Sequence, residues 1–371
     1  MITWARERSR LTREDLARRF PRLEDWEQGE LSPTIKQLER FARATHAPLG
    51  FFFLPEPPEE KIPIPDFRTM PGARNGQTSP DLLDTIYLCE QRQDWYRSFA
   101  RLMREGPAEP VAALTLDTPL IVAAEAMRAA LRFEVDDRGY GWADALRRLV
   151  EHAEDLGILV MVSSIVGSDT HRPLDPAEFR GFALVDPLAP LVFVNGADTK
   201  AAQIFTLVHE LAHIWLGQSA LSNPDASAVA GASVERWCNA VAAEVLVPLA
   251  GFRDDFDRQA RLTDELDRHA RRYKVSTLVV LRRAHDAGFL DAEAYRAAAA
   301  AELDRVLALV EERGSGGNFY NTQPARVSRR FARAIITSTL EGRTLYREAF
   351  QLLGFKKLST FETLADRLGV G

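Results

Sequence analysis

The feature that most constrains this chain is the run His209-Glu210-Leu-Ala-His213, which lies inside an otherwise apolar stretch of sequence. Positions i and i+4 of an α-helix lie on one face, so both imidazoles can reach one cation without distorting the backbone. A polar and charged cluster within a buried helix is costly unless a metal ion pairs with it. The run therefore predicts a metal site on a buried helix.

A third ligand is expected from a helix farther along the chain, because a catalytic zinc ion takes three protein ligands and keeps one position open. Residues 233–248 carry two carboxylates, Glu235 and Glu244. At about 100° per residue, Glu235 shares a helix face with Asn239 and with the small Ala242, which allows close packing against the first helix. Glu244 points the opposite way. We therefore predict Glu235 as the third ligand and Glu244 as a solvated surface charge.

The residues beside these ligands suggest roles of their own. Glu210 follows the first histidine, where its carboxylate can act as a general base toward an activated water. Asn239 either orients a metal ligand or is a buried asparagine whose amide bonds to backbone. Cys238 lies about 60° from Glu235 around the helix, which makes it a poorer ligand. Two imidazoles and one carboxylate with an open position fit one Zn2+ ion per chain best.

The remaining pattern predicts a predominantly helical α+β protein with a small antiparallel sheet. The last two expected strands are joined by a short turn with two prolines, which is typical of a hairpin. Strands are expected at 158–165, 182–185 and 191–194, and helices at 80–105, 121–155, 199–216, 234–247 and 260–312.

The stretch Phe182–Gly217, followed by Glu235-x-x-x-Asn239 and Pro248, resembles the ImmA/IrrE metallopeptidases. The resemblance covers roughly residues 80–250 and implies a zincin-type core in which the two histidines and the glutamate of the second helix bind zinc. It also implies that Glu210 is the general base and that one hairpin strand lies along the cleft. Members characterised as peptidases cleave Xre-type repressors, which lifts repression of stress-response or mobile-element genes. The resemblance thus implies a narrow zinc endopeptidase acting on a regulatory protein.

A second interpretation treats the zincin core as a non-proteolytic scaffold. Relatives fused to Xre-type segments often look like components of toxin–antitoxin loci, so the partner would be a toxin encoded next door. The intact Glu210 favours the enzyme. No residue identifies itself as the stabiliser of an oxyanion; His171, Arg180 and Tyr140 are candidates, and each also has an ordinary structural explanation.

Residues 1–54 resemble an Xre, lambda-repressor-like helix-turn-helix domain, and a proline-rich linker follows at 55–79. The matching pieces are Leu11–Ala17, Trp26–Gly29 and Pro33–Leu38.

This segment departs from the pattern at one place. Only eight residues separate Ala17 from Trp26, about four fewer than usual, and the missing ones belong to the turn and the start of the helix that would meet base edges. The charge is also modest, with ten Arg and Lys against eight Asp and Glu in residues 1–50. We therefore expect a degenerate unit that is kept for packing or for recognition of a partner, with DNA binding as the alternative.

Residues 313–371 form a basic segment that we expect to be helical, beyond a metallopeptidase-like domain at 80–312. It carries ten Arg and Lys against four Asp and Glu and follows the glycine-rich run 314–317, so it could dock independently. Four arginines at helical spacing predict a patch for an acidic protein or for phosphates, and a solvated basic face is the alternative. They are Arg326, Arg329, Arg330 and Arg333.

Composition narrows the class of protein further. The net charge of −6 argues against a chain that coats nucleic acid over its whole surface. The two cysteines, Cys89 and Cys238, are far apart and indicate a reducing compartment rather than a disulfide framework. No apolar run approaches the ~20 residues that span a bilayer, and no signal peptide is recognisable. We expect a cytoplasmic protein without a membrane anchor; the oligomeric state is left open.

Overall fold

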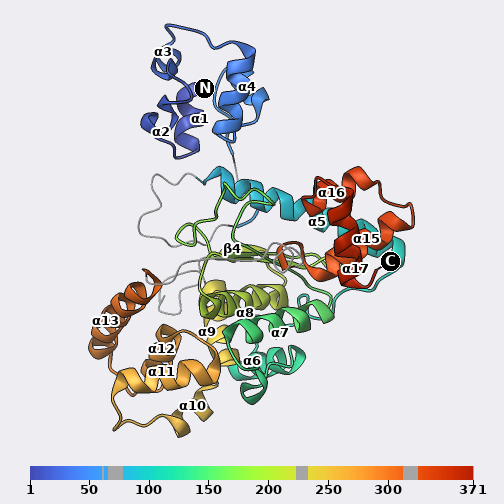
Figure 1. Cartoon of the computed structure of the whole chain (residues 1–371). Coiled ribbons are helices and arrows are strands. Elements are labelled where there is room, and N and C mark those ends of the chain that lie inside the picture. Colours follow the sequence, from blue (N-terminus) through green and yellow to red (C-terminus); the bar gives the residue numbers. More distant parts are fainter. Residues whose placement is uncertain (61, 66–77, 223–232, 312–324, 371) are drawn as a thin grey trace. The chain divides into compact units, whose positions relative to one another are not determined.

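The computed structural model describes residues 1–60, 62–65, 78–222, 233–311 and 325–370 (Figure 1). The chain divides into two compact units. An N-terminal unit comprises Met1–Pro63 and Pro71–Tyr87, and a main unit comprises Ile64–Met70 and Leu88–Gly371. Many helices and a single small sheet make up the described residues, so the predicted α+β class with predominant helix is confirmed. Within those residues, every helix is too short or too polar to cross a membrane.

The N-terminal unit is built from short helices around an aromatic core. Phe20, Trp26 and Phe41 pack edge to face or tilted, with the ring centres of Phe20 and Phe41 5.3 Å apart. Capping boxes in which a threonine side chain bonds the backbone three residues on begin two of the helices, at Thr12 and Thr34. The elements are α1 (Ile2–Arg8), α2 (Arg13–Ala17), α3 (Leu23–Gln28), α4 (Ile35–Ala44) and η1 (Leu49–Phe53).

The sheet of the main unit is mixed, with strand order β1-β3-β2-β4. Its strands are β1 (Leu159–Ser163), β2 (Gly181–Leu184), β3 (Leu191–Asn195) and β4 (Ala220–Ser222). The predicted hairpin is present as the antiparallel pair β2–β3. The expectation of a wholly antiparallel sheet is wrong for one pair, because β3 lies between β1 and β2 and runs parallel to β1. The chain reverses its direction between β1 and β2 and again between β2 and β3, so β3 runs in the same direction as β1. The short β4 was not predicted.

Helices cover both faces of this sheet (Figure 1). On one side, α8 (Lys200–Leu216) contacts β2 and β3, and α7 (Trp142–Asp155) contacts β1. On the other side, α5 (Pro80–Met103) is joined to the sheet by Gln93, whose amide donates to the Leu184 oxygen over 2.9 Å. Nearly every residue of α8 is buried, because α9 (Ser233–Leu246) packs on its remaining surface. The predicted metal helix is therefore the centre of the unit.

The C-terminal end of α9 is held by arginine side chains. Arg128, Arg138 and Arg283 all donate to carbonyl oxygens in its last turn or just beyond it. Arg138 is 1% exposed, and one of its nitrogens lies 2.6 Å from the Leu246 oxygen and 2.7 Å from that of Tyr273. Burial lowers the pKa of Arg138 to about 9. The free carbonyls of a helix end are thus satisfied by cations, which also suit its negative dipole.

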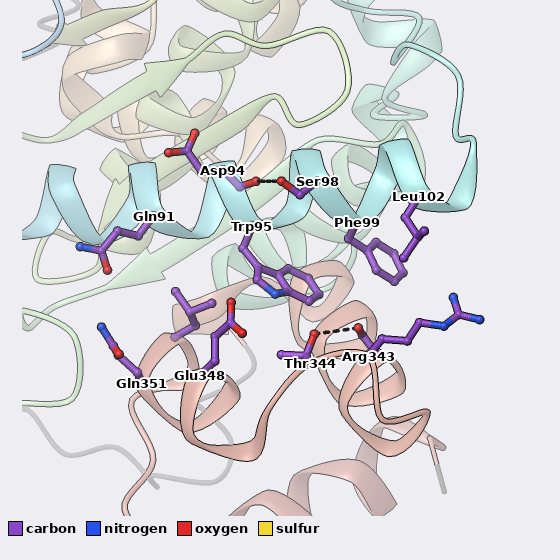
Figure 2. A pocket seen from close by; sticks show the side chains of 12 residues that line it. Gln91, Asp94, Trp95, Ser98, Phe99, Leu102, Arg343, Thr344, Glu348 and Gln351 are labelled. Atoms are coloured by element: carbon purple, nitrogen blue, oxygen red, sulfur yellow. Dashed lines mark hydrogen bonds between the residues drawn. The ribbon is translucent and has the colours of Figure 1, made fainter.

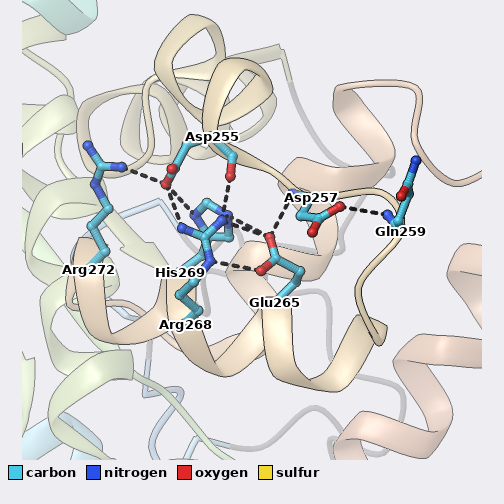
Figure 3. A network of polar contacts seen from close by, with 7 residues as sticks. All are labelled: Asp255, Asp257, Gln259, Glu265, Arg268, His269 and Arg272. Carbon is cyan, nitrogen blue, oxygen red and sulfur yellow. Dashed lines mark hydrogen bonds and ion pairs between the residues drawn. The ribbon is translucent and has the colours of Figure 1, made fainter.

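Four helices continue from α9, and the first two are tied by ion pairs (Figure 3). Arg268 donates to Asp255 at 2.9 Å and to Glu265 at 2.8 Å, and Arg272 joins Asp255. His269 is buried beneath them. Because these charges neutralise one another, the network ties α10 to α11. The four are α10 (Leu249–Asp255), α11 (Leu262–Tyr273), α12 (Thr277–Asp286) and α13 (Ala292–Glu311). Another helix, α6 (Leu120–Ala130), precedes α7 and packs on α9.

The C-terminal helices belong to the main unit. They are α15 (Arg329–Leu340), α16 (Tyr346–Leu353) and α17 (Leu358–Leu368). Arg92 of α5 donates to the Leu352 oxygen over 2.9 Å, and α15 contacts β1. A cavity of about 610 Å³ remains in this seam, where Trp95 and Phe99 of α5 face Thr344 and Glu348 (Figure 2). The expectation that this segment docks independently is therefore wrong for its described helices, which pack against α5 and β1 as part of the main unit.

Glu154 of α7 holds the start of α15. Its carboxylate accepts hydrogen bonds from the Ser328 hydroxyl and from the Arg330 backbone. Burial raises the pKa of Glu154 to about 7, although these hydrogen bonds oppose the rise. The side chain therefore titrates near neutral pH in the folded chain and near pH 4.5 in an unfolded one.

We expect this difference to make stability depend on pH. Between about pH 4.5 and 7 the folded chain keeps the Glu154 proton and the unfolded chain loses it, so the free energy of unfolding falls as pH rises. Glu154→Gln cannot ionise and should lack this decline, gaining up to about 3 kcal/mol relative to wild type between pH 4.5 and 8. Urea denaturation at both pH values measures it, with exposed Glu134→Gln as control. A pH-independent difference would contradict the assignment.

Candidate metal centre

Two helices bring the three predicted ligands together. His209 and His213 come from α8 and Glu235 from α9. The two imidazole Nε2 atoms lie 3.2 Å apart, and the Glu235 oxygens lie 3.3 Å from His209 Nε2 and 3.0 Å from His213 Nε2. Ligands placed about 2.0–2.1 Å from a tetrahedral zinc ion lie about 3.3 Å from one another. The three side chains therefore have the separations of a zinc site and can hold a metal ion.

The electrostatics of the cluster favour metal-binding protonation states. Both histidines are completely buried, and Glu235 is 6% exposed. Burial pushes the pKa of Glu235 upward, but its contacts with the two imidazoles outweigh this and lower it to about 2. Burial also lowers the pKa of His213. A carboxylate and a neutral imidazole are the forms that bind a metal ion.

Glu210 lies beside these ligands and forms no ion pair with a described residue. It is completely buried, and neither carboxylate oxygen makes a hydrogen bond of ordinary geometry to another described residue. Burial, followed by the negative charge of Glu235, raises the pKa of Glu210 well above its ordinary value, although an interaction with the Ser222 side chain opposes the rise. A buried carboxyl group without a partner costs about 1–3 kcal/mol or more. Such an arrangement is typical of a functional group that meets its partner in a ligand.

Gly181 of β2 allows the sheet to come this close to α8. A Cβ atom at this position would lie 2.7 Å from Thr206 Cγ2, 2.9 Å from the Phe193 oxygen and 3.0 Å from Glu210 Cγ. The backbone oxygen cannot move aside easily, so a larger residue would shift β2 or the Glu210 side chain. The absence of a side chain at 181 therefore sets the position of the general-base candidate.

Ser222 is a site residue that sequence reasoning missed. It ends β4, is completely buried, and its hydroxyl oxygen lies 3.4 Å from His213 Nε2. The strand has three residues, too few for a recognisable alternation of apolar and polar side chains. Only the pairing of β4 with β2 brings Ser222 to the cluster.

The prediction for Glu244 was wrong in one respect. Glu244 lies outside the cluster of His209, His213 and Glu235, but it is 8% exposed rather than solvated. Its carboxylate pairs with Arg283 and accepts the Leu249 backbone N–H over 3.2 Å. The helix-face argument assumed that α9 packs on one side only, whereas α8 and α6 both pack against it. The face opposite Glu235 is therefore interior as well.

The neighbouring candidates on α9 have other surroundings. Asn239 is partly buried, and its Oδ1 has no hydrogen-bond partner among the described residues. It lines a cavity of about 610 Å³ together with Glu244 and Arg283. Burial raises the pKa of Cys238 well above its ordinary value, and its thiol lies outside the cluster of His209, His213 and Glu235.

The three oxyanion candidates are scattered. Tyr140 is 98% exposed and His171 is also exposed. Arg180 forms an ion pair with Asp198, at 3.4 Å. Exposed side chains cannot line a site whose ligands are buried, so Tyr140 and His171 are structural or surface residues.

The basic C-terminal residues bind other groups of the same chain. They do not form a free patch, because their groups bind acidic side chains, a phenol and a carbonyl of the same unit. Arg329 pairs with Glu151, Arg330 with Glu105 and Tyr96, and Arg333 with the Leu368 oxygen. Arg326, just before α15, is half-buried, and burial lowers its pKa. A cluster of arginines in the sequence therefore marks a helix attachment here.

Comparison with known families agrees with this geometry. Residues 153–285 match the IrrE N-terminal-like domain of peptidase family M78, a range that contains all three ligands and Glu210. This part of the chain is similar to the M78 family. The resemblance to the ImmA/IrrE metallopeptidases is thereby confirmed. Residues 327–367 match a domain of unknown function, DUF8813. No curated protein and no solved structure matches the chain significantly.

Two substitutions on α9 test the ligand set of this M78 domain. Glu235→Ala removes one of three donors, so we expect less than about 0.2 zinc per folded chain by elemental analysis. Glu244→Ala should keep the metal but lose about 3 kcal/mol of unfolding free energy, because it removes the nearer of the two carboxylates that pair with buried Arg283. Circular dichroism and urea denaturation accompany both. Zinc lost from a folded Glu244→Ala and retained by Glu235→Ala would show that the assignment is reversed.

Proposed function

We propose that this chain is a zinc-dependent endopeptidase of narrow specificity that acts on a regulatory protein such as an Xre-type repressor. One observation carries the proposal: the Nε2 atoms of His209 and His213 lie 3.2 Å apart, and each lies 3.0–3.3 Å from a Glu235 oxygen, beside the buried Glu210. The M78 match of residues 153–285 supports a peptidase rather than a purely structural metal site.

The residues divide the chemistry between them. Zinc, when bound, would supply Lewis-acid polarisation of a water molecule and of a peptide carbonyl. His209, His213 and Glu235 would hold the ion and leave its fourth position open. Glu210 would accept a proton from the attacking water on its carboxylate and then donate it to the nitrogen of the leaving amine. The buried surroundings of Glu210 strengthen both transfers, because water does not compete for its oxygens.

A second candidate function rests on the closure of the site. His209, Glu210 and His213 have no exposed surface, so a polypeptide reaches them only after some part of the structure moves. A non-proteolytic scaffold, such as an antitoxin-like partner of a toxin, would need no access at all. Narrow specificity follows from the same closure if the correct substrate is the one that opens it.

We also propose a protein rather than DNA as the partner of the N-terminal unit. Arg6 and Arg13 both bind Glu27 of α3, at 2.6 Å, and Arg8 binds Glu60. These cations are therefore neutralised within the unit. DNA binding by residues 1–54 and a cytoplasmic location stay predictions from the sequence.

Replacing the general base tests the peptidase proposal. Glu210→Gln should keep zinc and fold but lose cleavage by a factor of about 10²–10⁴, because an amide cannot accept the proton. The assay incubates zinc-loaded protein with the repressor encoded beside it and follows fragments by mass spectrometry. Glu293→Gln, an exposed glutamate on α13, is the matched control. Cleavage by Glu210→Gln at the wild-type rate would rule out this mechanism. Neutralisation of a neighbouring toxin without any cleavage would favour the scaffold.

A further inference from the structure

The outer edge of β4 is covered by a segment of the same chain. As the last strand in the order β1-β3-β2-β4, β4 would present unpaired backbone groups. All three of its residues are nevertheless completely buried. The backbone N–H of Leu221 donates to the carbonyl oxygen of Pro65 over 2.9 Å. The edge is thus occupied by residues that lie more than 150 positions earlier in the sequence.

This edge borders the metal centre. Ser222 follows Leu221, and its hydroxyl oxygen lies 3.4 Å from His213 Nε2. Successive residues of a strand are about 3.3 Å apart, so backbone paired with Leu221 runs alongside the ligand cluster. A peptide that adds to a sheet edge obtains its affinity from such main-chain hydrogen bonds. The Pro65 segment therefore lies where an extended substrate would pair.

The segment has the chemistry of a weak, displaceable occupant. Ile64 anchors it, being 8% exposed and grouped with the main unit, whereas the preceding Pro63 is exposed. Pro65 accepts one hydrogen bond from Leu221, but proline has no N–H to return to a strand partner. Directly opposed residues of an antiparallel pair can exchange two hydrogen bonds. A substrate with an ordinary residue in place of Pro65 can therefore bind the same edge more strongly.

We propose that Ile64 and Pro65 form a built-in competitor for the peptide-binding edge of β4. The incoming partner is an extended polypeptide segment with an aliphatic side chain in the place of Ile64 and a residue other than proline in the place of Pro65. It binds by displacing the resident segment, and this displacement opens the buried centre. The competition at β4 is a property of the fold alone; its effect on cleavage rests on the proposed peptidase function.

A substitution that displaces the segment from β4 tests the proposal without a measurement of catalysis. Ile64→Asp places a charge at a buried position, so the segment should leave β4, and amide exchange in the peptide containing residues 220–222 should quicken at least about tenfold. Hydrogen exchange followed by mass spectrometry measures this in metal-free and zinc-loaded protein. Leu345→Asp, a change of the same kind at a residue that is 74% exposed, is the control. If Ile64→Asp does not fold, Ile64→Ala serves as a milder variant.

A second measurement links the segment to access. The probe is N-acetyl-leucyl-leucine hydroxamate, a zinc-binding dipeptide, titrated into zinc-loaded wild type, Ile64→Asp and Leu345→Asp. We expect at least about tenfold tighter binding by Ile64→Asp, because the competitor is gone. Unchanged exchange at β4 would overturn the occupancy itself. Faster exchange with unchanged probe affinity would overturn the competition. Absence of zinc from all three proteins would instead refute the proposed peptidase and leave the exchange result standing.

Discussion

The burial of two imidazoles and two carboxylates between α8, α9 and β2 is the constraint on which the main unit depends. Taking such groups out of water is expensive unless a cation neutralises them and their geometry is fixed. The fixing comes from regular elements: Gly181 lets β2 approach α8, and arginine side chains hold the last carbonyls of α9. The ligand separations are therefore set by helix and strand packing, and a site on such elements is more precise than one on loops.

The sequence predicted what depends on local periodicity. The spacing of His209 and His213 and the helix face of Glu235 need only the geometry of one helix, and the structure brings these three together. Glu244 could not be placed, because its surroundings depend on how many helices pack on α9. The three-residue β4 is too short to show an alternation of apolar and polar residues. The sequence therefore predicted neither the place of Ser222 nor the hydrogen bond from Leu221 to Pro65 at the strand edge. Tertiary pairing, rather than propensity, decides such positions.

Counts of charged residues led to the least accurate predictions about the surface of the protein. Arginines that look available in the sequence turn out to serve helix ends and buried carboxylates, as Arg330 does for Tyr96 and Glu105, and Arg138 for the end of α9. A guanidinium group has five donors and can satisfy several carbonyls at once, which an ammonium group does less well. In this chain a cluster of positive charge therefore reflects the need to join helices, and it says little about an outside partner.

The long-range packing of α16 has a consequence for how the protein is made. The last residue of the candidate metal cluster is Glu235, but the Arg92 contact that joins α16 to α5 needs Leu352, 117 residues later. At ribosomal rates of about 5–20 residues per second, those residues take roughly 10 s to appear. During that interval the residues of the metal cluster have been synthesised, but the C-terminal helices that pack on α5 and β1 have not. The nascent chain is thus exposed to aggregation after its metal-binding sequence is complete, and chaperones have their main opportunity there.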